Sequence, residues 1–265
     1  MSKKLLMNNY SENGLMPVMD GLVCWLDGRD YDGTNSIKDR VSKKIFTCNN
    51  ITNNKQAFVY AKSDSTIFAE FNASEAMYDL FNSDFTLCFE DKISRVISGS
   101  SLNYPSSYPR LIHFNYFSGN SPYQLSYNGE TYTISGSRMT LIGYNMNSND
   151  IFKSININYN PSKKQIVLVK KGNSISAYLD GKKYETVSDN KNTIINLERL
   201  TLGNTYLANR TYYGKIYSFM AYNRALTEEE IQQNYLYEQS IERGEVSTEN
   251  LVAWDYEKKQ RTLSL

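Results

Sequence analysis

Histidine is nearly absent from this chain, because His113 is the single histidine among 265 residues. Serine–histidine and cysteine–histidine catalytic groups and multi-histidine metal sites all need an imidazole to move protons or to bind the metal. His113 stands in the apolar, strand-like stretch from Leu111 to Phe114. We therefore interpret it as a packed, hydrogen-bonded side chain, and these classes of site lack the residues that they require.

Cysteines and long apolar runs are also scarce. Cys24, Cys48 and Cys88 form an odd set without CxxC spacing, which argues against a disulfide framework or a zinc site and predicts inert thiols. No apolar run reaches the roughly 18 residues of a membrane-spanning helix. The opening MSKKLLMNNYSENG falls short of the apolar core of a signal peptide. We expect synthesis in the cytoplasm without a signal peptide, and no membrane insertion.

The chain carries no excess of charge, since 29 basic residues face 28 acidic ones and the formal net charge is +1. This balance offers no electrostatic attraction to nucleic acid, so we expect no nucleic-acid partner. Tyrosine is abundant instead, with 22 residues against 11 phenylalanines and 2 tryptophans. Tyrosine suits exposed sheets and interfaces, because its ring packs while its hydroxyl stays hydrated.

Short alternating segments separated by turn dipeptides are typical of strands. Residues 84–91 place Phe85, Leu87 and Phe89 on one face of a predicted strand. Asn128-Gly129 predicts a tight hairpin between residues 123–127 and 131–134. Strand candidates about 8–12 residues apart, with turn chemistry between them, indicate a sandwich or jelly roll.

The last third of the chain gives the clearest pattern. Strands are predicted over residues 166–169, 174–179, 183–187, 200–202 and 215–222, with Asp180-Gly181 as a hairpin turn. Thr227 and Glu230 then form a capping box that starts a helix. Ile231 and Tyr235 share one face of this helix and should dock it on the sandwich.

No composition break divides the chain. We predict an N-terminal arm over residues 1–20, one jelly-roll domain over residues 21–240, and a C-terminal strand or arm over residues 241–265. This length is within the range of a single large β domain.

Three segments of the chain resemble the concanavalin A-like, laminin G-like jelly rolls: IVLVKKGNSISAYLDGKK, LTLGN and YGKIYSFMAYNRALTEEEIQQNY. GLVCWLDGRD and DFTLCFED extend the resemblance more loosely, so that it covers residues 21–238. The opening and closing words are most similar to laminin G-like domains in bacteriophage particle proteins of Firmicutes. The resemblance implies an all-β fold: a two-sheet antiparallel jelly-roll sandwich with one short C-terminal helix.

Relatives that hydrolyse glycans carry acidic words such as E-x-D-x-E, which place paired carboxylates on one face of a strand. This chain has no such word. Glu90 and Asp91 are adjacent and face opposite ways, and a predicted turn separates Glu185 from Asp189. On these grounds we expect the protein not to be an enzyme, with no catalytic residues.

Asp27, Asp30 and Asp32 cluster near a turn and could offer oxygen ligands to Ca²⁺. Related laminin G-like domains sometimes bind calcium at a sheet rim. The spacing lacks the calcium-loop pattern, however, and the alternative is that these aspartates accept hydrogen bonds from local amides. No other cofactor or metal is predicted.

Two tyrosine-rich loops are candidate glycan contacts, because exposed aromatic rings can stack on sugar faces. The alternative is that these rings cover the core or contact a neighbouring subunit. The candidate glycan-binding residues are Tyr104, Tyr108, Tyr123, Tyr206, Tyr212 and Tyr213.

Two functions follow as hypotheses. The first is a structural component of a bacteriophage particle (fibre, baseplate or head decoration). It would be located in the virion, contact other virion proteins and form a homo-oligomer. The alternative is a carbohydrate-binding, lectin-like module of a bacterial or phage protein that recognises a cell-wall polysaccharide. The two are compatible, since a fibre can bind the host surface.

Overall fold

The computed structural model describes residues 10–11, 14–49, 51–60, 68–72, 84–93, 110–114, 123–128, 137–145, 148–151, 155–159, 164–188, 199–203 and 214–244. Apart from one helix and a short 3₁₀ turn, the described elements are strands. They are β1 (Tyr10–Ser11), β2 (Gly14–Leu15), β3 (Leu22–Asp27), η1 (Gly28–Asp30), β4 (Ser36–Lys38), β5 (Ile45–Asn49), β6 (Thr52–Asn53), β7 (Phe58–Tyr60), β8 (Phe68–Asn72), β9 (Phe85–Ile93), β10 (Arg110–Phe114), β11 (Tyr123–Asn128), β12 (Ser137–Asn145), β13 (Ser148–Ile151), β14 (Ile155–Tyr159), β15 (Lys164–Lys171), β16 (Ser174–Leu179), β17 (Lys182–Ser188), β18 (Arg199–Leu202), β19 (Gly214–Tyr222) and α3 (Glu228–Glu242).

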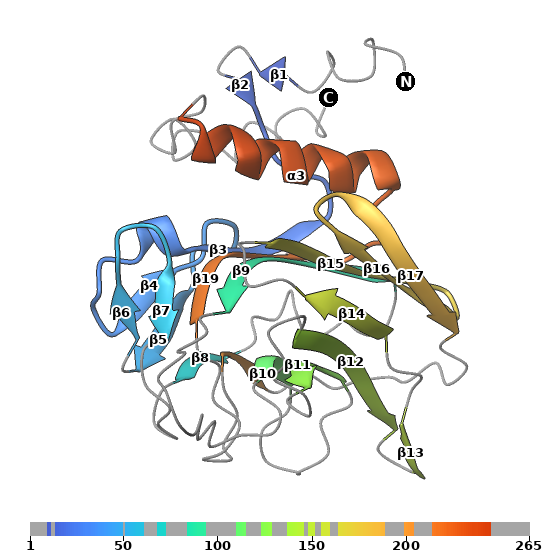
Figure 1. Ribbon diagram of the computed structural model, residues 1–265. Coiled ribbons are helices and arrows are strands. Elements are labelled where there is room, and N and C mark those ends of the chain that lie inside the picture. Colours follow the sequence, from blue (N-terminus) through green and yellow to red (C-terminus); the bar gives the residue numbers. More distant parts are fainter. Residues whose placement is uncertain are drawn as a thin grey trace, which may run out of the picture.

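Two large antiparallel sheets form the sandwich. The nine-stranded sheet has the order β13-β12-β11-β10-β18-β8-β5-β4, with β14 pairing β12. The eight-stranded sheet has the order β17-β16-β15-β9-β19-β7-β6, with β3 pairing β19. Figure 1 shows α3 lying across the outer face of the eight-stranded sheet, with the other sheet on the opposite side. The predicted antiparallel sandwich with one C-terminal helix is confirmed.

The two faces of β9 divide the core as the alternation predicts. Cys88 belongs to the cluster that packs against α3. Phe89 points the opposite way, because successive side chains of a strand alternate between faces. Its ring centroid lies 5.0 Å from that of Phe219 on the neighbouring strand β19. Phe89 and Phe219 are both fully buried, so this face forms the interior between the sheets.

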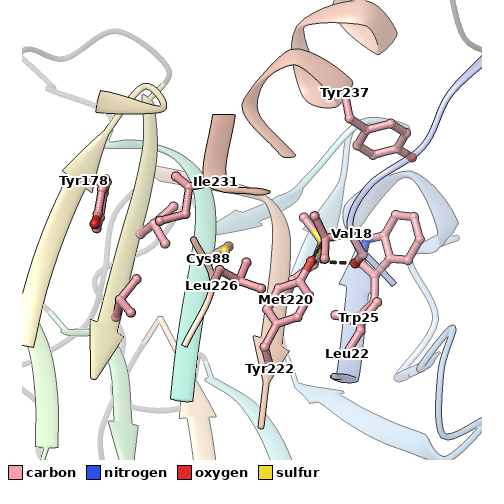
Figure 2. Packing of buried hydrophobic residues seen from close by; sticks show 12 residues of the cluster. Val18, Leu22, Trp25, Cys88, Tyr178, Met220, Tyr222, Leu226, Ile231 and Tyr237 are labelled. Atoms are coloured by element: carbon pink, nitrogen blue, oxygen red, sulfur yellow. Dashed lines mark hydrogen bonds between the residues drawn. The ribbon is translucent and has the colours of Figure 1, made fainter. Parts of the chain in front are cut away.

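Helix α3 closes the outer face of the eight-stranded sheet. Ile231 and Tyr237 from α3 are fully buried against Trp25, Met220 and other residues of this cluster, as Figure 2 shows. The rings of Trp25 and Tyr237 meet edge to face, with centroids 6.0 Å apart. This apolar contact fixes the helix on the sheet.

The end of the predicted N-terminal arm is packed beneath α3. Val18 is 6% exposed, and its backbone amide donates to Asn234 Oδ1 at 2.8 Å. Tyr222 donates its hydroxyl to the Val18 carbonyl at 3.0 Å, the contact marked in Figure 2. Asn234 Nδ2 in turn donates to the Tyr222 hydroxyl at 3.0 Å. Val18 is therefore part of the core, although the domain boundary predicted at residue 20 stays a prediction.

The capping box predicted from the sequence is present. Glu230 donates its amide to the Thr227 hydroxyl at 3.2 Å, and Thr227 donates its amide to Glu230 Oε2 at 2.9 Å. Arg224 donates to both oxygens of Glu230, at 2.6 and 2.8 Å. Hydrogen bonding from Arg224 is the main cause that lowers the pKa of Glu230.

We expect Glu230→Gln to reduce the acid sensitivity of the fold. A carboxyl whose pKa is lowered by folding stabilises the protein above its unfolded pKa of about 4.3, and that stabilisation is lost as the pH falls through the folded value. Urea unfolding from about pH 6 to pH 3 should show a smaller loss of stability for Glu230→Gln than for the wild type. The exposed Glu242 at the other helix end provides the control, Glu242→Gln. Parallel losses in the wild type and Glu230→Gln would contradict the expectation.

The prediction that residues 123–127 pair with residues 131–134 across Asn128-Gly129 is wrong in its second strand. β11 pairs with β12, in a register that places Tyr123 opposite Gly143 and Asn128 opposite Arg138. β12 is nine residues long and also pairs with β14 on its other side. A long strand with two partners gains more hydrogen bonds than a tight local turn, so tertiary pairing overrides the turn signal.

All three cysteines are free and buried, as predicted. Burial raises the pKa of Cys48 to about 12 and also raises the pKa of Cys24 and Cys88. The thiolate is the reactive form of cysteine, so these thiols are inert near neutral pH. In the described part of the chain, no helix combines the length and the apolarity needed to cross a membrane.

Candidate functional site

The hairpin of β16 and β17 presents an exposed aromatic side chain. Its turn is Asp180-Gly181, with φ values of +48° and +74°, which is the left-handed pair that a tight hairpin requires. The register shifts between Ala177 and Tyr178 on β16, so that Tyr184 on β17 is the additional residue of a bulge. Tyr184 is 42% exposed, and Ile45 is the other large hydrophobic side chain exposed among the described residues.

Polar groups from α3 stand beside this hairpin. Lys183 Nζ lies 3.7 Å from Glu228 Oε1 at the start of the helix. A Cβ placed on Gly181 would lie 2.7 Å from Gln232 Oε1, so helix and turn are in close contact. The hairpin and the neighbouring turn of α3 therefore carry an exposed aromatic ring, an ammonium, a carboxylate and an amide. Such groups can pack on an apolar face and hydrogen-bond to hydroxyls.

A second polar group, the buried charge cluster, lies between the sheet edge and α3. It consists of Asp27, Arg29, Arg40 and Glu238, and the side chains of both acids are 0% exposed. Arg29 donates to Asp27 Oδ1 at 2.6 Å and approaches both oxygens of Glu238 at 3.4 Å. Burial alone would lower the pKa of Arg29, but Glu238 and Asp27 raise it above its ordinary value. Arg29 therefore stays charged and joins β3 to the helix.

Arg40 completes this cluster from the β4–β5 connection. Its Nη1 lies 2.8 Å from Asp27 Oδ2, and its Nε lies 2.6 Å from Asp30 Oδ2. The guanidinium carbon also lies 4.4 Å from the centroid of the Trp25 ring, in cation–π contact. The side chains of the cluster thus bind each other, which is the arrangement of a structural ion network.

The three aspartates considered as calcium ligands bind to groups of the protein itself. Asp27 and Asp30 accept from the arginines, and Asp32 Oδ1 accepts from the Thr34 amide at 2.8 Å. Hydrogen bonding from Thr34 lowers the pKa of Asp32. Within the described residues, no group of at least three His, Cys, Asp or Glu side chains could hold a metal ion. The calcium hypothesis therefore has no support from their geometry.

Most of the predicted glycan-binding tyrosines lie outside the described part of the chain. Tyr104, Tyr108, Tyr206, Tyr212 and Tyr213 lie outside the described residues. Tyr123 begins β11, opposite Gly143, while its side chain and that of His113 are also outside what is described. These assignments stay predictions.

Sequence reasoning missed Tyr184 and the buried charge cluster. The exposure of Tyr184 could have been predicted. The segment KKYET after the Asp180-Gly181 turn has no apolar face, which indicates an exposed strand. No local signal pairs Arg29 with Glu238, because 209 positions separate them in the sequence.

The family model described as the concanavalin A-like lectin/glucanases superfamily matches residues 73–232, which is more than half of the 265-residue chain. No curated protein sequence matches the chain.

Solved structures with a similar fold include an enzyme and two binding domains. Trypanosoma rangeli sialidase matches with a TM-score of 0.62 at 16% identity, over 90% of this chain and 38% of the sialidase chain. The binding domain of botulinum neurotoxin DC in complex with rat synaptotagmin II matches with a TM-score of 0.59 at 14% identity, over 82% of this chain and 51% of that one. The receptor-binding domain of the botulinum neurotoxin C/D mosaic serotype gives 0.57 at 15% identity, over 83% and 52%.

These structures correct the expectation that the protein is not an enzyme. Sialidases are among the chains of similar fold. The expectation rested on missing histidines and paired carboxylates, but some glycosidases use neither a histidine nor a carboxylate nucleophile. The likeness shows the fold alone, and this chain spans only 38% of the sialidase, so no activity is transferred. Fold and family model agree, and the chain belongs to the concanavalin A-like lectin/glucanases superfamily.

Proposed function

We propose that this protein is a lectin-like recognition module that binds a carbohydrate. The observation that carries the proposal is the concanavalin A-like sandwich itself, together with the family match over residues 73–232. Two of the similar structures are named as binding or receptor-binding domains, which supports a recognition role for the fold.

Two surfaces are candidates for the carbohydrate contact. One is the segment with Tyr104 and Tyr108, which the sequence predicts to be a loop, together with the other tyrosines predicted from the sequence. The other is the β16–β17 hairpin, which carries the exposed ring of Tyr184 and, through Lys183, an ion pair with Glu228 of α3. A sugar has both apolar C–H faces and hydroxyls, so it needs an aromatic ring and polar groups side by side.

A glycan array that includes bacterial wall polysaccharides tests this function. We expect the wild type to bind a subset of glycans, and either Tyr184→Ala or the double variant Tyr104→Ala/Tyr108→Ala to weaken that binding about tenfold or more. Gln56→Ala is the matched control, because Gln56 is exposed in the β6–β7 turn and belongs to neither candidate surface.

Two outcomes would count against the proposal. Absence of binding to any glycan would overturn the function. Binding that survives all of the tyrosine changes would retain the function but remove both candidate surfaces.

We also propose, as the second candidate, that the protein is a structural component of a bacteriophage particle and assembles there as a homo-oligomer. The support is the resemblance of GLVCWLDGRD and YNRALTEEEIQQNY to phage laminin G-like domains. Mass spectrometry of purified virions from a strain that encodes the chain tests this role. Virions that lack the chain would refute it.

A further inference from the structure

The β4–β5 hairpin carries an exposed basic tip. Lys43 and Lys44 lie in the connection between the two strands, and Lys38 on β4 pairs with Ile45 on β5. The three lysines are exposed, and Ile45 is 73% exposed. We call Lys38, Lys43, Lys44 and Ile45 the hairpin tip. Figure 1 shows β4 and β5 at the opposite side of the molecule from β17.

Within its own hairpin, the hairpin tip has no exposed acidic residue to balance its positive charge. Asp39 is the only acidic residue between positions 33 and 60, and it is 1% exposed. Its carboxylate accepts from the backbone amides of Trp25, Val41 and Ser42. No lysine of the tip forms an ion pair with a carboxylate of the described residues. An anionic partner would therefore meet three lysines that are available for pairing.

The backbone at Lys43 gives an independent observation. Lys43 has φ +61°, a conformation that glycine or asparagine adopts more readily than lysine. Its ammonium donates to the Arg40 carbonyl at 2.7 Å, which leaves two of the three N–H donors of a lysine for another acceptor. The ammonium of Lys43 is therefore anchored at the hairpin and still has donors for an anionic ligand.

Protection of a sheet edge explains only part of this pattern. β4 ends the nine-stranded sheet, and a lysine such as Lys38 on an edge strand discourages aggregation. Lys43 and Lys44 lie in the turn beyond the strand, however, and an exposed Ile45 favours association. A basic and apolar tip is better suited to contact than to protection.

We propose that the hairpin tip docks an acidic glycan, one that bears sulfate, phosphate or carboxylate groups. This inference rests on the proposed carbohydrate-binding function and adds the charge class of the ligand. The three ammonium groups pair with the anionic substituents, and Ile45 packs on the apolar face of a sugar ring. A long polyanion such as DNA fits less well, because the net charge of the chain is only +1 and α3 carries five glutamates without a lysine or arginine.

Dextran sulfate and dextran of equal length are the test probes, because they share a backbone and differ in charge. We expect the wild type to bind dextran sulfate at least about tenfold more tightly than dextran, with an affinity that falls as salt is added. The hairpin variant Lys38→Thr/Lys43→Gly/Lys44→Ser should lose about tenfold in affinity for dextran sulfate. Glycine is favourable at the positive φ of position 43, so the variant should fold.

Lys55→Gly is the matched control. Lys55 is exposed and has φ +65°, but it lies in the β6–β7 turn instead of the hairpin tip. It should bind dextran sulfate as the wild type does. Equal losses for Lys55→Gly and the hairpin variant, or no loss for the hairpin variant, would overturn the inference.

Two further arms separate the ligand classes. Poly-glutamate or duplex DNA that binds the hairpin tip as tightly as dextran sulfate would overturn the assignment of a glycan. Selective binding of neutral glycans on the array, with the hairpin variant unchanged, would remove the inference while the proposed function stands. Absence of binding to every glycan, neutral or acidic, would remove both.

Discussion

Replacing Arg29 by Met should lower the free energy of unfolding by about 3–5 kcal/mol, because it breaks a buried ion network by removing one partner. Arg29 is 16% exposed and joins Asp27 to Glu238, whose side chains are 0% exposed. Without Arg29, the charge of Glu238 would lose this guanidinium in a region that excludes water. Asp27 would retain Arg40, at 2.8 Å. Urea unfolding at neutral pH measures the change.

Two variants separate the loss of charge from other effects. The double variant Arg29→Met/Glu238→Gln should recover part of the loss, because it also removes the buried negative charge that Arg29 approaches. Lys183→Met breaks the exposed pair with Glu228 on the same helix, whose partners are 48% and 63% exposed, and should cost less than about 1 kcal/mol. Equal effects of Arg29→Met and Lys183→Met would show that the buried charge cluster does not hold α3 in place.

Replacing Phe89 by Ala is the second change with a large expected effect, also about 3–5 kcal/mol. Phe89 is 0% exposed and packs against Phe219 between the two sheets. Its strand β9 lies in the middle of the eight-stranded sheet, between β15 and β19. The sheets cannot close over the missing ring without moving, so a cavity remains and its walls lose their contacts. Urea unfolding, followed by tryptophan fluorescence, measures the loss.

Phe89→Leu is the conservative control, since it retains most of the apolar volume, and we expect it to cost less than about half as much. Tyr184→Ala removes an aromatic ring that is 42% exposed, and it should cost about 1 kcal/mol or less. A Phe89→Ala protein as stable as Tyr184→Ala would place the core elsewhere than between β9, β19 and the opposite sheet.

Several elements could be predicted from the sequence because their causes are local. The alternation of Phe85, Leu87 and Phe89 indicates a strand with one strongly apolar face, and β9 has this form. Thr227 and Glu230 are three positions apart, so their reciprocal hydrogen bonds can be read from the chain itself. The Asp180-Gly181 turn was predictable for the same reason.

Pairing between distant strands was not predictable in the same way. Asn128-Gly129 is a strong turn signal, yet β11 pairs with residues 138–143 instead of the segment directly after the turn. The pairing of a strand depends on the hydrogen bonds and buried contacts of the whole sheet. A turn dipeptide contains no information about those distant contacts. The exposure of Ile45 on β5 is another tertiary property, because a neighbouring element could have covered this apolar side chain.

By itself the sequence determined the class of fold, the start of α3 and the buried face of its central strands, because side-chain period and cap chemistry act over a few residues. Only the tertiary structure decided that Arg29 meets Glu238 across 209 positions, and that three lysines of one hairpin form no ion pair with a carboxylate in the described part of the chain. Charges interact through space instead of along the chain. The hairpin tip and the buried charge cluster were therefore visible only in the tertiary structure, whereas the loop with Tyr104 and Tyr108 was proposed from the sequence.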